Sequence, residues 1–384
     1  MAHSWSMDFC DSLLDESHTA WRRVCKRFAE EEIRPHAVEW EEAESFPKEL
    51  YGAAGAAGII GTGFPEEVGG SGGGPLHMVA AVEGLLYGGS TGVAVGLGSA
   101  GIALPPIVQS GDDALIEQFV RPVLAGEQIS ALAVTEPGAG SDVSAIRTSA
   151  TREGDLYRVR GRKQFITSGV RADVLTTLVR TGEDRIGGLS FLAIPSSLDG
   201  VEVSRSLKKT GWRASDTAEI AFDDVLVPAA YLLGAEGSAF STLMRNFAGE
   251  RLALAAYGAA TARIAYEEAR DYAAQREVFG RRLDGHQLSR HKLAEMATRV
   301  SVARTYVYQV ARQMAAGREV IAEVAMAKNF SADVANRVCY EAVQLLGGMG
   351  YMRESLVERL SRDVRLLPIG GGTSEIMREI IAKQ

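Results

Sequence analysis

The chain of 384 residues is 46% hydrophobic, which supplies enough apolar side chain to bury a core in two or three domains. Its formal net charge of −8 at pH 7 excludes the basic surface that nucleic-acid binding requires, so we expect no nucleic acid among its partners. The cysteines Cys10, Cys25 and Cys339 are odd in number and lack C-x-x-C spacing, which predicts reduced thiols, no bound metal and a cytoplasmic protein.

Residues 1–128 are predicted to form a helical domain. No basic segment followed by an apolar run opens the chain, so we expect no signal peptide. Apolar residues at helical spacing predict a helix over Ser17–Glu32, and Pro47 marks the start of another. The glycine-rich run Gly61–Gly74 lacks the preceding strand and the Lys-Ser/Thr pair of a phosphate-binding loop, which favours a surface loop.

The stretch Gly84–Gly111 carries no formal charge. A membrane span is one interpretation of such a run, but its repeated glycines and the pair Pro105-Pro106 favour a buried helix lined with small residues. We therefore expect this helix over Gly84–Gly101 and no membrane insertion. A further helix is predicted over Asp112–Glu127, with its apolar residues on one side.

Residues 129–232 are predicted to form a small antiparallel β domain, because the apolar period changes from that of a helix to two. Glycine and aspartate turns separate the expected strands, which are Ala131–Thr135, Tyr157–Arg160, Lys163–Thr167, Val174–Val179, Leu189–Ile194, Val201–Ser204 and Ala218–Phe222.

Residues 233–384 return to the helical period and are predicted to form an antiparallel bundle. A helix is expected to begin near Ser238, a long one to end near Gly317, and a third to end before Gly347-Gly348. The fold class is therefore mostly α with a central β domain.

A turn in the β domain has the features of a ligand site. After the strand that ends at Thr135, Pro137 and two glycines force a turn that leaves backbone N–H groups unpaired, and Ser141 adds a hydroxyl. These donors suit a phosphate or a ring carbonyl, while Thr135 and Thr167 would direct hydroxyls at the edge of a flat heterocycle. An ordinary Gly-Pro turn with surface threonines explains the same residues, and spacing alone leaves both interpretations open.

A second candidate is Glu250. Leu243, Phe247, Glu250 and Leu254 fall at i, i+4, i+7 and i+11, so a carboxylate interrupts the apolar face of one helix. Such a group is either paired with Arg251 in a structural role, or held in a dry pocket where its pKa rises toward a value useful for a base. Position alone leaves both open.

The order of the sequence segments is more specific than any one of them. AVTEPGAGSD, KQFITSG, GWRASDTAEIAFDDVLVP, QREVFGRRLDGHQ, EAVQLLGGMGY and GGGTSEIMREIIAKQ follow one another, and over nearly the whole chain this series resembles the acyl-CoA dehydrogenase flavoproteins. The resemblance implies an N-terminal helical domain, a β domain and a C-terminal domain like a four-helix bundle. It also implies FAD-dependent α,β-dehydrogenation of a fatty or branched acyl-CoA to the trans-2-enoyl-CoA, with electrons passed to an electron-transfer flavoprotein.

The resemblance further implies which residues bind FAD. Two groups would hold the flavin ring and the pyrophosphate: Leu132, Val134, Thr135, Gly140 and Ser141 in the first, and Phe165, Ile166 and Thr167 in the second. Thr373 and Glu375 would lie beside the nucleotide. A third group would reach the FAD of a neighbouring subunit, which implies a homo-oligomer, with a tetramer expected: Arg276, Phe279, His286, Gln287, Gln344, Gly347 and Gly348. Without the resemblance, Arg276 would be a solvated helix charge and Gln344 a capped polar side chain.

The chain departs from the family pattern at two places. Phe165 stands where tryptophan is common, which keeps a flat apolar wall but removes an N–H donor. Gly370-Gly371-Gly372 stands where many relatives have Tyr-Glu-Gly, so the glutamate that commonly removes the substrate proton is absent. The long-chain and isovaleryl-type relatives carry their base at the position that matches Glu250, which makes Glu250 the predicted base with Arg251 fixing the site.

These departures also bear on the substrate. Its predicted contacts are Ser141, Glu250, Arg251, Gly371 and Gly372, and the Gly371 N–H would bind the thioester carbonyl. Two glycines in the pocket wall predict room for a medium-to-long or branched acyl group, unless neighbours refill the space. Two other functions stay open at this point: a flavin-dependent oxygenase or oxidase on the same fold, and a non-catalytic partner subunit without FAD.

Overall fold

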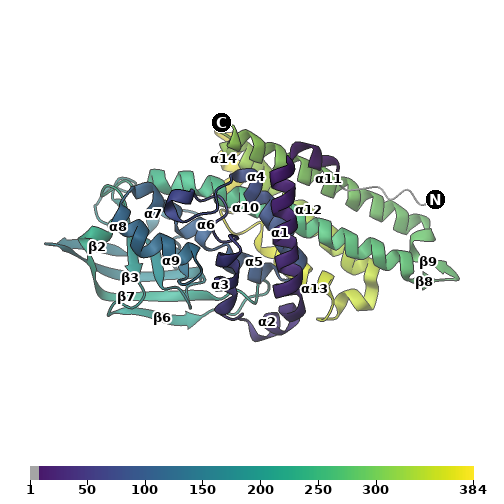
Figure 1. Cartoon of the computed structure of the whole chain (residues 1–384), viewed down its shortest axis with the longest axis horizontal. Coiled ribbons are helices and arrows are strands. Elements are labelled where there is room, and N and C mark those ends of the chain that lie inside the picture. The colour runs from purple at the N-terminus through teal and green to yellow at the C-terminus, as the bar shows by residue number, and fades with distance from the viewer. Residues whose placement is uncertain (1–7) are drawn as a thin grey trace.

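The computed structural model describes residues 8–384 (Figure 1). Helices occupy the first part of the chain, a β domain the middle, and long antiparallel helices the last part, which confirms the predicted fold class. The β domain lies at one end of the long axis of the molecule (Figure 1). The long helices extend to the opposite end, where the short β8–β9 hairpin lies.

The N-terminal part is built from short helices. Asp15 caps the first of them, α1, by accepting a hydrogen bond from the His18 N–H, as aspartate does at helix starts. The α-helices are α1 (Glu16–Phe28), α2 (Ala37–Ala43), α3 (Glu49–Ala56), α4 (Pro75–Leu85), α5 (Thr91–Leu97), α6 (Ala100–Ala103), α7 (Pro105–Ser110), α8 (Asp113–Leu115) and α9 (Arg121–Leu124). Shorter 3-10 and π turns are η1 (Asp8–Leu13), η2 (Ala29–Ile33), η3 (Arg34–His36), η4 (Glu66–Val68), η5 (Leu86–Gly88) and η6 (Ile116–Val120).

The helix predicted over Gly84–Gly101 is divided into several pieces, so that prediction was wrong. Gly89 adopts a left-handed conformation with φ of 76°, which ends one helical segment, and the Ser90 hydroxyl then caps α5. Gly96 packs so closely that a Cβ there would lie 2.7 Å from the ring of Phe46. Within residues 8–384 no single helix meets the length and hydropathy of a membrane span. Only the pair Thr91–Leu97 and Ala100–Ser110, bent by 44°, meets them together.

The β domain is one main sheet with the strand order β1-β4-β2-β3-β7-β6, and β5 pairs with β4. Its strands are β1 (Ser130–Ala133), β2 (Ser149–Glu153), β3 (Leu156–Thr167), β4 (Val174–Arg180), β5 (Leu189–Pro195), β6 (Val201–Ser206) and β7 (Thr217–Pro228). Short turns η7 (Val143–Ala145) and η8 (Ala229–Tyr231) adjoin them. The pairs β2–β3, β3–β7, β4–β5 and β6–β7 are antiparallel, as expected.

Two features of this sheet differ from the sequence prediction. β1 and β2 both run parallel to β4, because the chain forms the β2–β3 hairpin before it returns beside β1. Period-two patterning identifies strands but not their direction, so it could not show this. β2 itself was missed, since three of its five residues are exposed and it has little apolar alternation. The two expected strands between Tyr157 and Thr167 are one strand, β3, whose pairing with β7 has two register shifts, between Val159 and Gly161 and between Lys163 and Ile166.

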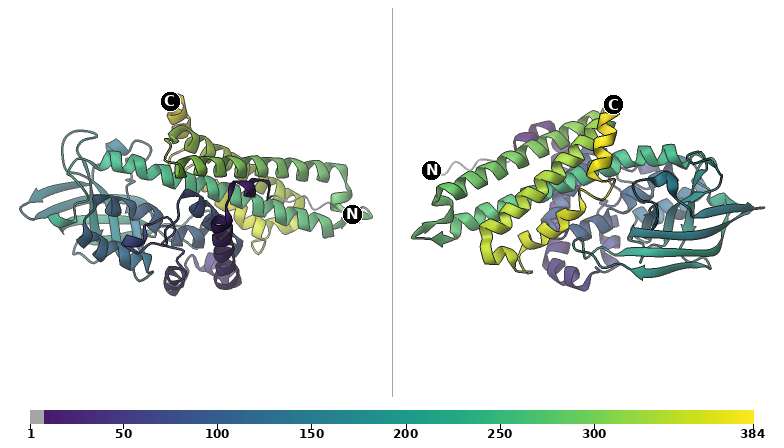
Figure 2. Two further views of the ribbon diagram at one scale, coloured as in Figure 1. Left: turned by 45° about the horizontal axis from the view of Figure 1, so that its top comes forward. Right: turned by 180° about the vertical axis from the view of Figure 1, so that it is seen from behind.

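The C-terminal part confirms the three predicted long helices, which lie side by side in both views of Figure 2. They are α10 (Ala239–Gln275), α11 (Gln287–Ala315) and α12 (Ile321–Leu346), and α13 (Leu356–Asp363) and α14 (Ser374–Ala382) follow. The hairpin β8 (Glu277–Val278) and β9 (Arg281–Arg282) joins α10 to α11, with turns η9 (Leu283–Gly285), η10 (Gly347–Tyr351) and η11 (Val364–Leu366) between the remaining elements. α10 runs from the β domain to this hairpin, so its N-terminal half adjoins all three parts of the chain.

Candidate active site

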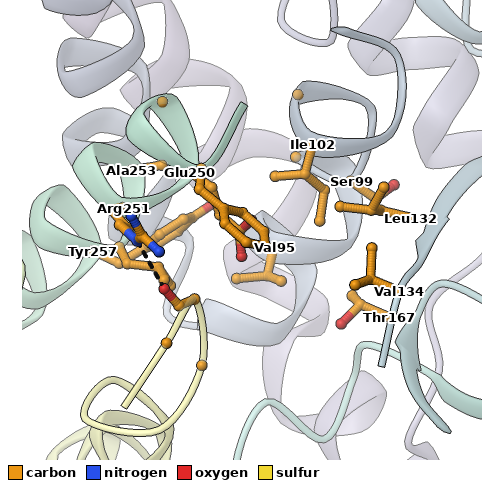
Figure 3. A pocket seen from close by; sticks show the side chains of 18 of the residues that line it. Val95, Ser99, Ile102, Leu132, Val134, Thr167, Glu250, Arg251, Ala253 and Tyr257 are labelled. Atoms are coloured by element: carbon orange, nitrogen blue, oxygen red, sulfur yellow. Dashed lines mark hydrogen bonds between the residues drawn. The ribbon is translucent and has the colours of Figure 1, made fainter. Parts of the chain in front are cut away.

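A cavity of about 1340 Å³ lies where the three parts of the chain meet. The ends of β1 and β3 form one wall, α10 forms the opposite wall, and α5 and α6 lie between them (Figure 3). The loop from Ile369 to Thr373, between η11 and α14, closes another side. The cavity therefore brings together segments that are far apart in the sequence.

A bulge in β3 shapes the β-domain wall. The register of the β3–β7 pair shifts between Lys163 and Ile166, and Phe165 within that bulge has a φ of 61°, which is unusual for a bulky residue. The Phe165 side chain is 63% exposed and lines the cavity. The bulge also brings Thr167, the last residue of β3, to the cavity wall beside Val134 (Figure 3).

A buried ion pair joins this bulge to the turn that follows β1. Lys163 is completely buried, and its Nζ donates to the Val134 carbonyl at 2.9 Å and to Glu136 Oε1 at 2.8 Å. Glu136 also accepts from the backbone N–H groups of Arg147 and Thr148. Burial lowers the pKa of Lys163 to about 8, although Glu136 opposes this shift. β1 and β3 are not neighbours in the sheet, so this contact and the hydrogen bond from the Gln164 N–H to the Thr135 carbonyl, at 2.8 Å, set their relative position at the cavity.

The β-domain wall fits a flat heterocycle with polar edges. The hydroxyls of Thr135, Ser141 and Thr167 line the cavity, and within residues 8–384 no protein group pairs with them. Apolar side chains surround these hydroxyls, and a Cβ added at Gly140 would meet no atom within 4 Å, so the turn is open to a ligand. This combination of an apolar wall with unpaired donors is the one expected for a flavin ring and its pyrophosphate.

Glu250 projects from the opposite wall. Glu250 points into the cavity from α10 (Figure 3), and Phe247 and Leu254 of the predicted face also line the cavity, whereas Leu243 does not. The Oε2 atom of Glu250 is buried and has no hydrogen-bond partner within the described chain. Burial raises the pKa of Glu250 above its ordinary value, and the nearby charges of Arg251 and Lys328 oppose the rise. A half-buried carboxylate of this kind is suited to accept a proton from a ligand in the cavity.

Within residues 8–384, Arg251 forms no salt bridge with Glu250. Its Nε donates to the Gly371 carbonyl at 3.1 Å, and its guanidinium lies over the ring of Phe247 at 5.1 Å. Burial lowers the pKa of Arg251, while Glu250 opposes that shift. The guanidinium thus connects α10 to the glycine loop (Figure 3).

The structure brings one set of predicted residues together and separates another. The cavity is lined by Leu132, Val134, Thr135, Gly140, Ser141, Phe165, Ile166, Thr167, Glu250, Arg251, Gly371, Gly372 and Thr373. The residues predicted to reach a neighbouring subunit lie outside it, as Arg276, Phe279, His286 and Gln287 are at or beside the β8–β9 hairpin and Gln344, Gly347 and Gly348 at the end of α12. Glu375 is also outside the cavity, and its exposed carboxylate pairs with Arg378.

Several residues of the site were not predicted. Lys328 on α12 is 1% exposed and donates to the Gly372 carbonyl at 2.6 Å, and Val95, Ser99, Ile102 and Tyr257 line the cavity (Figure 3). A signal for Lys328 existed in the sequence, because it interrupts an apolar run on a predicted helix, as Glu250 does. The small apolar residues of α5 and α6 gave no comparable signal.

Helical regions before and after a β domain, with a polar-edged apolar wall facing a buried carboxylate, have the arrangement of a flavin-dependent oxidoreductase. Sequence comparison agrees along the chain: residues 15–127, 131–225 and 237–384 match the N-terminal, middle and C-terminal domains of acyl-CoA dehydrogenase, respectively. The chain therefore belongs to the acyl-CoA dehydrogenase family, whose members are FAD-dependent enzymes that act on acyl-CoA.

Individual relatives cover almost the whole chain. The pig mitochondrial long-chain specific acyl-CoA dehydrogenase is 37% identical over 376 residues, which are 97% of this chain and 87% of the relative. A probable acyl-CoA dehydrogenase of Mycobacterium abscessus has a solved structure that is 53% identical with a TM-score of 0.95, covering 97% of this chain and 99% of that one. The glutaryl-CoA dehydrogenase of Mycobacterium smegmatis in complex with FADH2 is 26% identical with a TM-score of 0.90, covering 97% and 95%.

Proposed function

We propose that this protein converts a medium-to-long or branched acyl-CoA to the trans-2-enoyl-CoA, with Glu250 as the base, and passes the electrons to an electron-transfer flavoprotein. One observation carries the proposal. A carboxylate with an unpaired oxygen and a raised pKa lies in the cavity opposite the flavin-type wall, in a chain with glycine at the other family position for a base.

Different residues of the cavity would bind the flavin and remove the α-proton. Leu132, Val134 and Phe165 would hold the flavin ring, and the Thr135 and Thr167 hydroxyls would hydrogen-bond its edge. FAD, when bound, supplies the acceptor for the β-hydrogen, which leaves as hydride. Glu250 removes the α-proton at its carboxylate oxygen, and its burial gives it the proton affinity for this task.

The thioester carbonyl needs a donor as the α-carbon loses its proton. Gly371 lines the cavity, and its N–H has no protein acceptor within residues 8–384, so it is available to that oxygen. A donor directed at the oxygen where negative charge develops stabilises the transition state more than the ground state. The Gly371 N–H thus stabilises the thioester oxygen, while Glu250 accepts the proton from the α-carbon.

The size of the acyl group is proposed from the shape of the cavity. At Gly371 the space for a side chain is already filled, since a Cβ there would lie 2.4 Å from Leu254, whereas at Gly370 it is open apart from Leu366. The room comes chiefly from the N-terminal helices, because the cavity continues along apolar residues of α4 and α5: Met78, Ala81, Val82, Leu85, Ala94, Val95 and Leu97. The name of the pig relative, a long-chain specific enzyme, supports the same substrate class.

We expect flavin reduction to be more efficient with octanoyl-CoA or longer substrates than with butyryl-CoA. Each buried methylene contributes about 0.8 kcal/mol, so four more methylenes add about 3 kcal/mol and should raise kcat/KM at least about tenfold. Anaerobic stopped-flow mixing with a panel of acyl-CoAs, followed by bleaching of the flavin band, measures this directly. A profile that peaks at butyryl-CoA would contradict the proposed substrate class.

The same experiment separates the alternative functions. A partner subunit without FAD would show no flavin band. The unpaired hydroxyls of the β-domain wall argue against this alternative, because they suit a bound cofactor. After anaerobic reduction, admission of oxygen distinguishes the two enzyme classes. Slow reoxidation in air and fast reoxidation by electron-transfer flavoprotein support a dehydrogenase, and the reverse order supports an oxygenase or oxidase.

We also propose that the protein is a homo-oligomer in which the β8–β9 hairpin reaches the FAD of a neighbouring subunit. Phe279 is 98% exposed at that hairpin, with a φ of 49°, and Tyr351, Leu288 and Tyr340 are also exposed in the C-terminal part. A single chain leaves these apolar groups in water, as a surface that binds another subunit does.

The Phe279→Asp variant should therefore lose FAD affinity by about tenfold or more, because a charge would replace an apolar contact at the subunit interface. Equilibrium dialysis and light scattering measure the affinity and the assembly. Phe9→Asp is the control, since Phe9 is 73% exposed but lies on η1. Wild-type FAD affinity in Phe279→Asp, or a monomer that binds FAD fully, would refute the shared site.

A further inference from the structure

The glycine loop beside Glu250 is held in an uncommon backbone conformation. Gly371 and Gly372 have φ values of 65° and 99°, both in the region that favours glycine. A Cβ at Gly372 would lie 2.8 Å from the terminal methyl of Met377, which can move aside, so the φ of 99° is the main reason for glycine there. These two left-handed residues give the loop a backbone path that differs from a strand or a helix, and this path determines where the carbonyls of Gly371 and Gly372 point.

Both carbonyls meet a buried cation. The Gly371 oxygen accepts from Arg251 of α10 at 3.1 Å, and the Gly372 oxygen accepts from Lys328 of α12 at 2.6 Å. The next residue on α12, Asn329, donates to the Ser374 carbonyl at 3.1 Å. The loop is thus fastened to α10 and α12 by three side chains, and two of these side chains are positively charged.

Backbone bonds fix the two ends of the loop. The Gly370 N–H donates to the Leu366 carbonyl at 2.9 Å, and the Ser374 N–H donates to the Pro368 carbonyl at 3.0 Å. Between them, the N–H groups of Gly371 and Gly372 have no acceptor in residues 8–384. The contacts therefore hold the loop at both ends and at its carbonyls, and leave two N–H groups free in residues that line the cavity.

We propose that Lys328 is a positioning residue for the dehydrogenation, which holds the Gly372 carbonyl so that the Gly371 N–H stays directed at the thioester carbonyl of the substrate. This inference rests on the proposed function. Lys328 does not itself touch the substrate, because it acts through the peptide that it binds. Burial supports this role, because Lys328 is 1% exposed and water does not compete for its ammonium group. An exposed lysine would hold the loop less firmly.

Lys328 also contributes to the charge around Glu250. Burial, together with the nearby charge of Arg251, lowers the pKa of Lys328 to about 8, although Glu250 and Glu375 oppose the shift. Arg251 from α10 and Lys328 from α12 are the charges that lower the pKa of Glu250 against burial. The other charged side chains along the cavity are Asp142, Lys208, Lys209, Arg362 and Arg365. Removing Lys328 should therefore leave Glu250 with a higher pKa.

The test compares Lys328→Met with Lys292→Met in the FAD-loaded enzyme. Lys292 is the matched control because its Nζ also ties a neighbour to α12, at 2.8 Å from Glu341, away from the cavity. We expect Lys328→Met to bind FAD and to reduce it about 10- to 100-fold more slowly with acyl-CoA. The pH at which reduction is half-maximal on the acid side should move upward by about 0.5 units or more.

Two further measurements separate positioning from a merely structural role. Lys328→Arg retains a donor for the Gly372 carbonyl, so it should recover part of the rate and return the pH profile toward that of the wild type. A structural role alone would lower the melting temperature and the FAD content without moving the acid limb. A rate within twofold of Lys292→Met, or an unchanged acid limb in Lys328→Met, would overturn the proposal.

A third measurement does not depend on the identity of the base. The infrared carbonyl stretch of bound enoyl-CoA reports hydrogen bonding to the thioester oxygen. It should move to higher frequency in Lys328→Met, both in the wild-type background and in Glu250→Gln. An unchanged stretch refutes the positioning role. A shifted stretch together with normal flavin reduction in Glu250→Gln keeps Lys328 in its role and rejects only Glu250 as the base.

Discussion

In the Glu250→Gln variant, reduction of FAD by acyl-CoA is expected to slow by about 10³- to 10⁴-fold, the range for loss of a general base. The amide has the size of the carboxylate but cannot accept a proton at neutral pH. FAD and acyl-CoA binding should persist, because the contact between Arg251 and the Gly371 carbonyl does not involve Glu250. Anaerobic stopped-flow absorbance gives the rate, and titration with acyl-CoA gives the affinity.

Glu268→Gln is the matched control for this substitution. Glu268 lies on the same helix, and burial raises its pKa too, but it does not line the cavity. It should therefore reduce its flavin at nearly the wild-type rate. Near-normal bleaching in Glu250→Gln would reject Glu250 as the base and turn attention to oxygenase chemistry.

The structure also shows what is needed to move the base to the other family position. A Cβ at Gly371 would lie 3.5 Å from Glu250 Oε1, so a glutamate there would direct its carboxylate into the same region. The same Cβ would lie only 2.4 Å from Leu254, and the φ of 65° strains any side chain. Gly371→Glu should thus recover little activity in Glu250→Gln until Leu254→Ala makes room.

Regular periodicity explains why the long helices could be predicted. Leu243, Phe247 and Leu254 recur at helical spacing along α10, and the same rule found α11 and α12. It failed over Gly84–Gly101, where the break depends on the left-handed Gly89 and on the Ser90 cap of α5, neither of which leaves a periodic signal. Small residues fit a continuous helix and a broken one equally well.

The site could be predicted only in part, for a similar reason. Glu250 was found because a charge in an apolar stripe is conspicuous on its own helix. Lys163 and Lys328 depend on partners that are distant in sequence: Val134 and Glu136 for the first, and Gly372 for the second. Only the folded chain brings these groups together, so sequence spacing could not show that each lysine holds a cavity-lining segment by its backbone.

A second buried charge network has a large predicted effect on stability. Glu83 of α4 is 4% exposed and binds Arg304 of α11 through two hydrogen bonds, at 2.7 and 3.1 Å. The Tyr308 hydroxyl donates to it at 2.6 Å and Arg22 of α1 at 3.3 Å. One carboxylate thus joins two N-terminal helices to the C-terminal bundle. Burial opposes its ionisation, but Arg304 and the other donors overcome burial and lower the pKa of Glu83 to about 2.

Glu83→Gln should lower the free energy of unfolding by about 3–5 kcal/mol at neutral pH, because Arg22 and Arg304 would lose the buried carboxylate that they share and would keep the more exposed Asp11. The control Glu153→Gln removes an ion pair with Arg158 in which the Glu153 side chain is 45% exposed, so water screens it and its loss should cost far less stability. Urea unfolding at constant FAD concentration measures both.

The pH dependence makes the Glu83 prediction specific. A carboxylate whose pKa is about 2 in the folded chain and near 4.5 in the unfolded chain stabilises the fold above pH 4.5, and this contribution is lost as the pH falls toward 2. The wild type should therefore lose about 3 kcal/mol over this window from Glu83 alone, whereas Glu83→Gln has no such charge to lose. The stability difference between the two proteins should narrow as the pH falls from 5 toward 2. A difference that stays constant with pH, or one no larger than that of Glu153→Gln, would show that the network does not stabilise the junction between the N-terminal helices and the bundle.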